Sequence, residues 1–316
     1  MFFSGKIKIS STGSYTPERI VTNEDLAPKV NSSPEWIYEN LGITERRICE
    51  KNQFTSDLAA NAGLSALKAA NIDASEIDLL IVATSTPDRK APSTACIVKH
   101  KMKMNSTCPA FDISAVCSGF IYALSIASDM MKDKKYKNVM LIGADTFSKI
   151  TDWTRRDAVF FGDGAGAVIL RQSDYKDALF SSILFSESSN PDHFTVHPED
   201  DFFTMNGKAV FETGTKVLPE AIHTIMDHNH MTVDQIDYII PHQPSIGILK
   251  ETAKILELPF SKIKTNMKNY ANTSGATIPL LLDEVNRRGE FKTNDKVVFA
   301  AVGSGWTWGA AIYVWH

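Results

Sequence analysis

The feature that most constrains the fold of this chain is an internal repeat. Three segments of the first half have counterparts about 155–160 residues later. EIDLLIVATSTP resembles QIDYIIPHQPS, VCSGFIYALSIASDMM resembles TSGATIPLLLDEV, and NVMLIGA resembles DKVVFAAVG. Because three separate pairs share one spacing, they indicate two homologous halves rather than a chance likeness. We expect these halves, residues 1–174 and 175–316, to pack together as a pseudo-dimer.

Within the first half, short apolar runs alternate with helix-like stretches. The runs at 77–84, 108–113, 138–144 and 165–170 are apolar throughout, which is typical of strands buried on both faces of a helix-covered sheet. The chain is therefore predicted to be an α/β protein with one five-stranded sheet in each half.

Two segments carry weaker signals. GDGAGA at 162–167 has the spacing G-x-G-x-G and precedes an apolar run, whereas a dinucleotide loop needs G-x-G-x-x-G before a helix. We interpret it as a tight turn that enters a strand. The polar stretch 186–201 shows no period and is predicted to be a loop or cap.

Composition excludes several classes of protein. A net charge of −4 disfavours nucleic acid as a partner, because such binding rests on phosphate contacts. No apolar run approaches the roughly 18–20 residues that span a bilayer, so we expect no membrane association. The beginning of the chain, MFFSGKIKIS, lacks the apolar region of a signal peptide. The four cysteines show no metal-binding spacing, which favours reduced thiols, no metal and a cytoplasmic location.

Three residues are chemically distinctive, and the repeat aligns two of them with each other. Cys117 and Asn272 occupy matching loops, each shortly before a Ser-Gly pair and a helix-like run, and His242 ends the apolar run YIIP. Sites in open α/β sheets form beyond the carboxyl ends of the strands, so these residues are predicted to converge. A thiol at a helix start is favoured as thiolate by the helix dipole, and we expect a lowered pKa for Cys117.

A Cys-His-Asn set is compatible with two chemistries. In a papain-like hydrolase the asparagine orients a histidine base. In decarboxylative carbon–carbon bond formation, neutral histidine and asparagine N–H groups instead stabilise a developing enolate oxygen. The papain signature C-G-[SA]-C-[WY] is absent around Cys117, and the duplicated halves favour the second chemistry. A non-catalytic scaffold is a third, less favoured interpretation.

The chain resembles the β-ketoacyl-acyl-carrier-protein synthase III family of the thiolase superfamily over nearly its whole length. The motifs that carry the resemblance include TGSYTPERIVTNEDL, AVCSGF, MNGKAVFE, PHQPSIGIL, YANTSGATIPLLLDE and GSGWTWGAAIYVW. This resemblance implies a thiolase-like fold, in which two βαβαβαββ-type halves form a five-layered α-β-α-β-α core. It also implies a homodimer that works without a cofactor on acyl-CoA and acyl-carrier-protein thioesters.

The resemblance further implies roles for individual residues. Cys117 would accept an acyl group from a thioester, and His242 and Asn272 would hold malonyl-carrier protein as it loses CO2 and attacks the acyl-cysteine. The backbone N–H groups of Cys117 and Ser304 would form the oxyanion hole. Two more groups follow by motif: Trp36 and Arg155 for the CoA nucleotide, and Met205, Gly207 and Phe211 for the pantetheine tunnel.

Several positions depart from the family pattern. Asn40 replaces an arginine that stacks on adenine in many members, Glu212 and Gly247 replace basic residues linked to carrier docking, and Ser245 replaces an asparagine. Ala91 replaces a bulky aromatic that closes the partner's acyl pocket, so a roomier pocket is expected. These changes leave open a family member that makes resorcinols, quinolones or pyrones in a specialised pathway, or an acyltransferase that does not condense.

Overall fold

The strands form two large sheets and two small ones within residues 1–105, 107–132 and 135–316, which the computed structural model describes. The first large sheet has the spatial order β2 (Ile7–Tyr15), β8 (Asp163–Gln172), β7 (Val139–Thr146), β5 (Leu79–Ala83) and β6 (Ala110–Ile113). The second has the order β1 (Phe2–Gly5), β9 (Phe180–Ser186), β14 (Thr307–Val314), β13 (Lys296–Gly303) and β12 (Tyr238–Pro241). The small sheets pair β3 (Ile20–Thr22) with β4 (Glu45–Arg47), and β10 (Phe194–Thr195) with β11 (Thr204–Met205).

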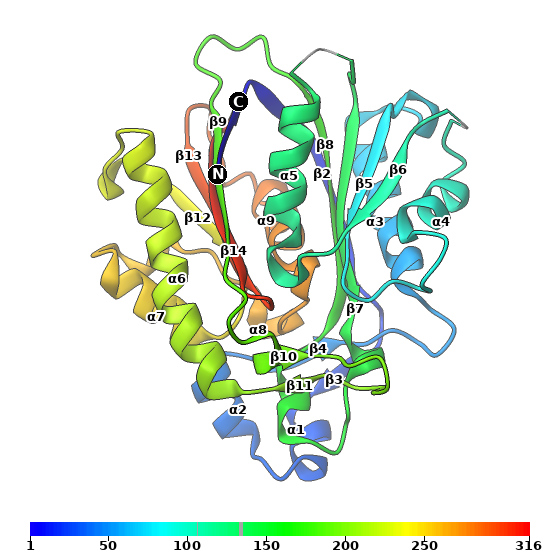
Figure 1. Cartoon of the computed structure of the whole chain (residues 1–316), viewed down its shortest axis with the longest axis vertical. Helices are drawn as coiled ribbons and strands as arrows, with labels where there is room; N and C mark the ends of the chain where they lie inside the picture. Colours follow the sequence, from blue (N-terminus) through cyan, green and yellow to red (C-terminus); the bar gives the residue numbers. More distant parts are fainter. Residues whose placement is uncertain (106, 133–134) are drawn as a thin grey trace.

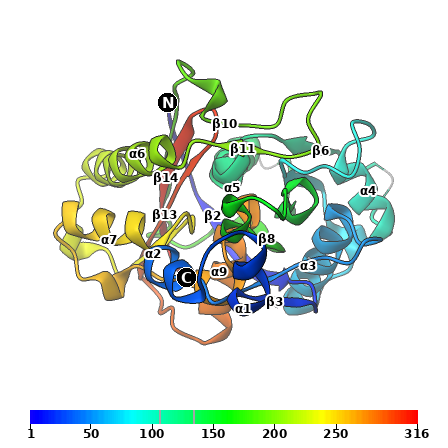
Figure 2. The same cartoon turned by 90° about the horizontal axis from the view of Figure 1, so that it is seen from below.

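Helices cover both outer faces of the sheets and fill the space between them. The longer helices are α2 (Pro34–Leu41), α3 (Thr55–Ala70), α4 (Thr94–Lys101), α5 (Gly119–Met130), α6 (Gly207–His228), α7 (Ile246–Ile255) and α9 (Thr277–Arg287). The single-turn helices are α1 (Asn23–Leu26) and α8 (Met267–Tyr270). Helices α5 and α9 lie between the two large sheets, α3 and α4 cover the first sheet, and α6 and α7 cover the second (Figures 1 and 2).

The core follows this layering. One apolar cluster joins α5 and α9 to the inner faces of both sheets, a second lies under α6 and α7, and a third lies under α3. Strands β5, β7 and β13 are buried almost throughout, as their continuous apolar runs predict. The predicted five-layered α-β-α-β-α arrangement is confirmed.

The two large sheets share a pattern of strand pairing. In the first sheet β5 is parallel to β7, and β8 and β2 follow antiparallel. In the second sheet β12 is parallel to β13, and β14 and β9 follow antiparallel. Strand β1 lies before residue 174, in the predicted first half, but it pairs with β9 in the second sheet. This pairing covers an edge of β9 that would otherwise expose unpaired backbone groups.

GDGAGA leads into a strand as predicted, but the predicted turn is too long, because β8 already begins at Asp163 and Gly164 and Gly166 lie within it. The physical reason is the close approach of α9. A Cβ atom on Gly166 would lie 2.4 Å from the backbone N of Leu280. On the neighbouring strand, a Cβ atom on Gly143 would lie 2.1 Å from the carbonyl oxygen of Gly275. Glycine at these positions lets the turn before α9 lie directly on the sheet.

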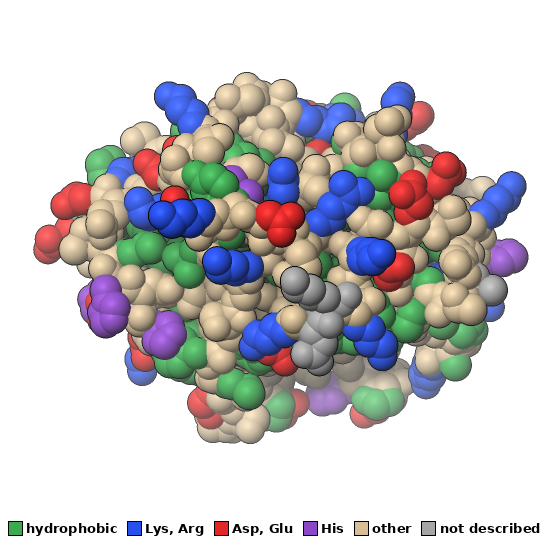
Figure 3. All heavy atoms as spheres, turned by 90° about the horizontal axis from the view of Figure 1, so that it is seen from above, with side chains coloured by type: hydrophobic (Ala, Val, Ile, Leu, Met, Phe, Trp, Pro, Cys, Tyr) green, Lys and Arg blue, Asp and Glu red, His purple; other side chains and the backbone are tan. Residues whose placement is uncertain are grey.

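Figure 3 shows the molecule from above, with Lys and Arg side chains, fewer Asp and Glu side chains and apolar patches interspersed over this face. In the ranges that the structure describes, no helix is both long and apolar enough to cross a membrane.

Candidate active site

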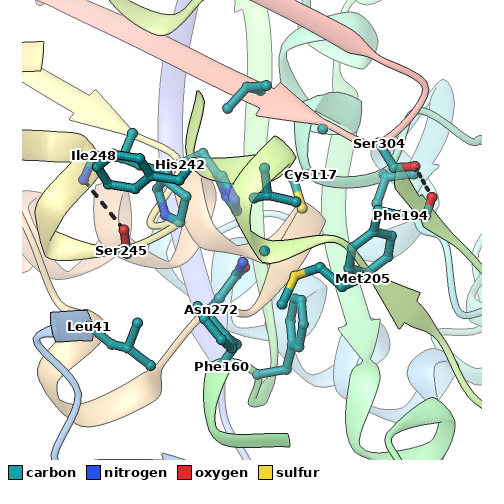
Figure 4. Close-up of a pocket in the computed structure, with 18 of the residues that line it drawn as sticks. Leu41, Cys117, Phe160, Phe194, Met205, His242, Ser245, Ile248, Asn272 and Ser304 are labelled. Atoms are coloured by element: carbon teal, nitrogen blue, oxygen red, sulfur yellow. Dashed lines mark hydrogen bonds between the residues drawn. The ribbon is translucent and has the colours of Figure 1, made fainter. Parts of the chain in front are cut away.

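Cys117 lies in the turn that joins β6 to α5. Residues Val116–Ser118 form one 3₁₀ turn, and α5 begins at Gly119. Val116 has a φ angle of 46°, in the left-handed region that a β-branched residue rarely adopts. Such strain is found where the surrounding structure over-determines a functional position. It sets the cysteine at the helix start, with its sulfur facing a cavity (Figure 4).

Asn272 occupies the matching turn before α9. Its preceding residue, Ala271, is also in a left-handed conformation, with a φ angle of 56°. The backbone N–H of Asn272 donates to the carbonyl of Phe160 at 3.0 Å, and its own carbonyl accepts from the N–H of Gly162 at 3.0 Å. The side chain is therefore carried by a backbone fixed on both sides.

His242 follows β12 directly. Its backbone N–H donates to the carbonyl of Ala300 at 2.8 Å, which continues the parallel pairing of β12 with β13. Its side chain is buried, and Nδ1 has no hydrogen-bond partner among the described residues. Burial lowers the pKa of His242 to about 3, so the imidazole is neutral at physiological pH.

One cavity of about 340 Å³ brings these three side chains together. Figure 4 shows Cys117, His242 and Asn272 facing the same space from three separate segments of the chain. The wall is mostly apolar and includes Leu41, Val116, Phe160, Phe161, Phe194, Val210, Pro244, Ile248, Val302 and Trp306. Among the described residues that line it, none is Asp, Glu, Lys or Arg. The cavity therefore offers one nucleophile and a small number of neutral polar groups in an apolar space, as ligand sites commonly do.

Known proteins similar to this chain agree on one family. Two family models match, described as 3-oxoacyl-[acyl-carrier-protein (ACP)] synthase III over residues 111–188 and as its C-terminal part over residues 226–315. The β-ketoacyl-[acyl-carrier-protein] synthase III of Clostridium acetobutylicum is 43% identical, and the alignment covers 98% of each chain. The Neisseria meningitidis enzyme is 43% identical over 96% of this chain and 98% of the relative. The chain belongs to the β-ketoacyl-[acyl-carrier-protein] synthase III family.

Solved structures of similar proteins share the fold. The crystal structure of the 3-oxoacyl-[acyl-carrier-protein] synthase III of Aquifex aeolicus superposes with a TM-score of 0.94 at 37% identity, covering 98% of this chain and 100% of the other. The priming β-ketosynthase of the R1128 polyketide pathway superposes with a TM-score of 0.89 at 26% identity, covering 99% and 97%. The predicted thiolase-like fold is therefore confirmed.

Most residues that the synthase III motifs assign to substrate line the cavity. Trp36, Met205, Gly207 and Phe211 all contribute to its wall. The departing residues Asn40 and Ser245 line it as well. The Asn40 amide donates to the backbone carbonyl of Trp36 at 2.9 Å, so it is turned back onto its own helix.

The turn after β13 packs against the turn that carries Cys117. A Cβ atom on Gly303 would lie 3.0 Å from the backbone N of Cys117. Ser304 follows in the chain, lines the cavity, and donates from Oγ to the carbonyl of Phe194 at 2.5 Å. The absence of a side chain at Gly303 thus lets the two turns that carry Cys117 and Ser304 lie close together.

Arg155 lies away from the cavity wall. Its guanidinium donates to the carbonyl of Phe203 at 3.0 Å and to the Asp157 carboxylate at 2.5 Å. The next residue, Arg156, instead lies over the Trp36 ring, 4.1 Å from the ring centroid. The motif pointed to Arg155, but a sequence motif cannot predict which of two adjacent arginines turns its side chain toward Trp36.

Ala91 also lies outside the wall of this cavity. It is exposed on the loop before α4 and is not among the residues that line the cavity within a single chain. A role in shaping an acyl pocket would therefore act on a second copy of the chain, as the resemblance implies. Glu212 is exposed on α6, and its carboxylate lies 3.7 Å from the Lys208 ammonium group.

The predicted lowering of the Cys117 pKa is wrong. Burial of the sulfur raises the pKa of Cys117 to about 12, and the hydrogen bond to Ser274 opposes that shift. Desolvation disfavours a thiolate in an apolar cavity more strongly than one helix start favours it. The resting sulfur is a protonated thiol, and its activation requires a group that accepts the proton.

Sequence reasoning missed several wall residues. Phe194 belongs to the stretch predicted as a loop, yet it forms β10 and packs in an aromatic cluster with Phe147, Phe161 and Phe203. Trp306 lines the cavity from the turn after β13. The repeated aromatic residues near 194–203 were the available signal, but their contacts depend on tertiary packing rather than on a local period.

Proposed function

We propose that this protein is a ketosynthase of the synthase III type. Cys117 takes an acyl group from a thioester, acyl-CoA or acyl-carrier protein, and the acyl-enzyme then condenses with malonyl-carrier protein, with loss of CO2, to give a β-ketoacyl thioester. Such a reaction initiates fatty-acid chains. The observation that carries the proposal is that a thiol, a neutral imidazole and an asparagine amide share one apolar cavity.

In the first step, the Cys117 sulfur attacks the thioester carbonyl carbon and the C–S bond of the donor breaks. The backbone N–H groups of Cys117 and Ser304 are our candidates for stabilising the negative oxygen of the tetrahedral intermediate. Donors of this kind, fixed in a water-poor site, stabilise charge that develops in the transition state. The close approach of the two loops at Gly303 supports this assignment.

In the second step, loss of CO2 leaves a carbanion whose charge is shared with the malonyl thioester oxygen. His242 and Asn272 are our candidates for holding that oxygen. A neutral imidazole offers one N–H donor, and the Asn272 amide nitrogen remains available because its oxygen already accepts from Ser274 at 2.8 Å. The carbanion then attacks the acyl carbon on Cys117, and the free thiol is restored.

Access to the site follows from the remaining wall residues. Met205, Gly207 and Phe211 suit a pantetheine arm, since they contribute an apolar part of the wall. For the nucleotide end of CoA we propose Trp36 together with Arg156, whose guanidinium already stacks on the indole. No resident metal or organic cofactor is needed for either step.

The proposed working form is a homodimer in the cytoplasm, in which Ala91 of one copy lies at the end of the acyl pocket of the other. Cys49, Cys96, Cys108 and Cys117 are all free thiols, which agrees with a reducing compartment. A small side chain at position 91 favours donors longer than acetyl.

Intact-mass measurement tests the proposal directly. The protein is incubated with acetyl-, butyryl-, hexanoyl- and octanoyl-CoA in separate samples, and then with malonyl-carrier protein. We expect a mass gain of one acyl group, lost again when β-ketoacyl-carrier protein appears, and neither event in Cys117→Ala. A stable acyl-enzyme that never condenses would favour a plain acyltransferase. Hydrolysis of the donor without a β-keto product would favour the papain-like chemistry.

A further inference from the structure

A buried carboxylate connects the two halves of the chain beside the turn that carries Asn272. Asp145 lies in β7, near its carboxyl end, and its side chain is fully buried. Oδ1 accepts from the hydroxyl groups of Thr84, Ser85 and Thr86 at 3.1, 3.1 and 2.8 Å. It also accepts from the backbone N–H groups of Ser85 and Thr86 at 2.8 and 3.1 Å. Oδ2 accepts from a backbone N–H of the turn before α9, at 2.8 Å.

All of these groups donate to Asp145. The backbone N–H groups can only donate. The Thr84 hydroxyl accepts from the N–H of Thr86 at 3.2 Å, and the Thr86 hydroxyl accepts from the N–H of Thr146 at 2.8 Å, so each can direct its own proton to Asp145. Burial raises the pKa of Asp145, and the hydrogen bonds that it accepts act against that rise. Among the described residues, no Lys or Arg forms an ion pair with it, so the carboxylate serves the loop and the turn.

The donor in the turn before α9 is the N–H of Gly275. The N–H of the preceding residue, Ser274, donates to Oδ1 of Asn272 at 2.8 Å. Both N–H groups lie at the start of the 3₁₀ turn Ser274–Ala276, where backbone donors have no partner within a helix. One planar peptide unit joins Ser274 to Gly275. A displacement of Gly275 therefore also displaces the residue that orients the Asn272 amide.

Gly275 also lies against the turn that carries the nucleophile. A Cβ atom on Gly275 would lie 3.1 Å from Oδ2 of Asp145 and 3.5 Å from the carbonyl oxygen of Val116, the residue before Cys117. Figure 4 shows Cys117 and Asn272 facing the same cavity. The hydrogen bond between Asp145 and Gly275 is thus made where the two turns that carry these side chains meet.

We propose that Asp145 is a positioning residue for the ketosynthase reaction. It holds the turn before α9 against β7 and so keeps the Asn272 amide aimed at the malonyl thioester oxygen. Asp145 touches no substrate and acts through Gly275 and Ser274. Donors that stabilise charge in a transition state lose effect when they move, and a misplacement of about 1 Å costs about 10²-fold in rate. This inference rests on the proposed function, in which Asn272 serves the decarboxylation step.

Asp145→Asn breaks the link to the turn and keeps the link to the loop. Only one end of an amide accepts hydrogen bonds. Since five donors face Oδ1, the amide oxygen takes that place and the NH2 group faces the N–H of Gly275. Two donors then oppose each other, which displaces the turn before α9. Gly275→Ala is a second variant, because its methyl group would meet Oδ2 at 3.1 Å and push the turn away without removing the charge.

Separate measurement of the two half-reactions distinguishes positioning from a general loss of stability. Acyl-enzyme formation is followed by rapid-quench mass measurement, and decarboxylation by release of CO2 from malonyl-carrier protein, below the melting temperature of every variant. In both variants we expect decarboxylation to fall about 10–10²-fold and acylation to fall less than about threefold. A general loosening of the fold would slow both half-reactions together.

Asp283→Asn is the matched control. Asp283 is also a buried carboxylate, lies on α9 itself, and accepts from Thr12, Ser14 and Arg287. The replacement is the same, but these hydrogen bonds do not involve the turn before α9. We expect Asp283→Asn to lower the melting temperature and to leave the ratio of the two half-reaction rates unchanged.

Amide hydrogen exchange tests the link without any substrate. Peptides that cover residues 270–280 are fragmented to resolve single amides. We expect the Gly275 amide to exchange slowly in the wild type and about tenfold faster or more in Asp145→Asn.

Fast exchange of the Gly275 amide in the wild type would overturn the inference, as would unchanged exchange in Asp145→Asn. Equal slowing of both half-reactions in Asp145→Asn and Gly275→Ala would also overturn it. If Asp145→Asn does not fold, Gly275→Ala decides between the same outcomes. A wild type that catalyses neither half-reaction would refute the proposed function, and the exchange measurement would still decide whether Asp145 holds the turn.

Discussion

The backbone N–H of Ser274 donates to Oδ1 of Asn272 at 2.8 Å. This hydrogen bond assigns the two ends of the amide, because only the oxygen can accept it. The amide nitrogen is thereby left to face the cavity as a donor. The same residue, Ser274, thus orients the proposed enolate donor through its backbone and contacts the nucleophile through its hydroxyl.

Removal of the Asn272 donor should separate the two half-reactions. We expect Asn272→Ala to slow decarboxylation of malonyl-carrier protein by about 10²–10³-fold, the typical effect of losing one such donor. Acyl-enzyme formation should change far less, since Cys117 and its backbone donor are untouched. Rapid-quench mass measurement of each half-reaction checks this, with His242→Ala as the parallel variant. Equal loss of both half-reactions in the two variants would instead indicate that the histidine acts as the base for the thiol.

Because His242 is buried and neutral, we expect it to make the free energy of unfolding depend on pH. Its pKa is 6.5 as an ordinary histidine and about 3 in the folded protein, so the unfolded chain binds the proton more tightly. The contribution of His242 to stability is therefore complete above pH 6.5 and is lost as the pH falls toward 3. The loss has a slope of up to about 1.4 kcal/mol per pH unit.

Urea unfolding between pH 7 and pH 4 measures this slope. In His242→Gln, which cannot titrate, the dependence of the unfolding free energy on pH should be shallower by about one proton over the lower part of this range. Identical slopes in the variant and the wild type would mean that the imidazole is hydrated or protonated in the folded protein. Arg46 offers no such titration, since burial lowers its pKa only to about 10, which lies above this pH range.

The internal repeat and the apolar runs were sufficient to predict the layers and the convergence of three distant residues. In both halves a helix begins at the same edge of the sheet. The turns before α5 and α9 therefore meet there, together with the carboxyl end of β12. The glycines of β8 were misread because their reason is the close approach of α9, which is a contact between the two halves. A local motif cannot show that Leu280, 114 residues further along the chain, packs against Gly166.

The directions of side chains and their exposure to solvent could not be predicted from the sequence either, because both depend on tertiary contacts. Whether Arg155 or Arg156 stacks on Trp36 depends on which backbone carbonyls are near each guanidinium, and Arg155 is held by the carbonyl of Phe203. The pKa of Cys117 depends on how much apolar wall surrounds the sulfur as well as on the helix that follows. Ser274 was overlooked because it resembles an ordinary structural residue until its contact with the Cys117 sulfur is seen.

The contact at Gly303 predicts a selective effect on acyl transfer. A methyl group there would meet the backbone N atoms of Cys117 and Ser118 at 3.0 Å, so Gly303→Ala should push the two loops apart. We expect acyl transfer to fall about 10–10²-fold, because oxyanion donors lose effect when they are displaced. Gly207→Ala adds a methyl group to the proposed pantetheine part of the wall, where a Cβ meets no atom within 4 Å, so its effect should appear in the KM for the donor and not in the rate of acylation at saturation. An unchanged acylation rate in Gly303→Ala would argue against an oxyanion hole between these loops.

The stacking of Arg156 on Trp36 predicts which arginine contributes to CoA binding. Arg156→Ala should raise the Kd for CoA about 5–30-fold, through loss of a cation that lies 4.1 Å from the ring centroid. Arg155→Ala should affect Kd less and lower the melting temperature instead, because its guanidinium ties Phe203 and Asp157 together. Isothermal titration of CoA and thermal melts of both variants distinguish these effects. A larger rise in Kd for Arg155→Ala would restore the assignment made from the motif.

The small side chain at position 91 predicts a preference for longer acyl donors. Ala91 is exposed on the single chain, where it is available to a second copy. Each methylene that the pocket buries contributes about 0.8 kcal/mol, or roughly fourfold in kcat/KM for a donor that fits. In Ala91→Phe, kcat/KM should therefore fall by one to two orders of magnitude for octanoyl and hexanoyl donors and stay unchanged for acetyl.

Phe203 is held in its aromatic cluster and cannot refill the space, whereas Phe202 is 43% exposed. Phe202→Ala is accordingly the control, and its chain-length profile should match the wild type. Equal losses for all four donors in Ala91→Phe, or a wild type that accepts acetyl alone, would contradict a pocket shaped by this residue.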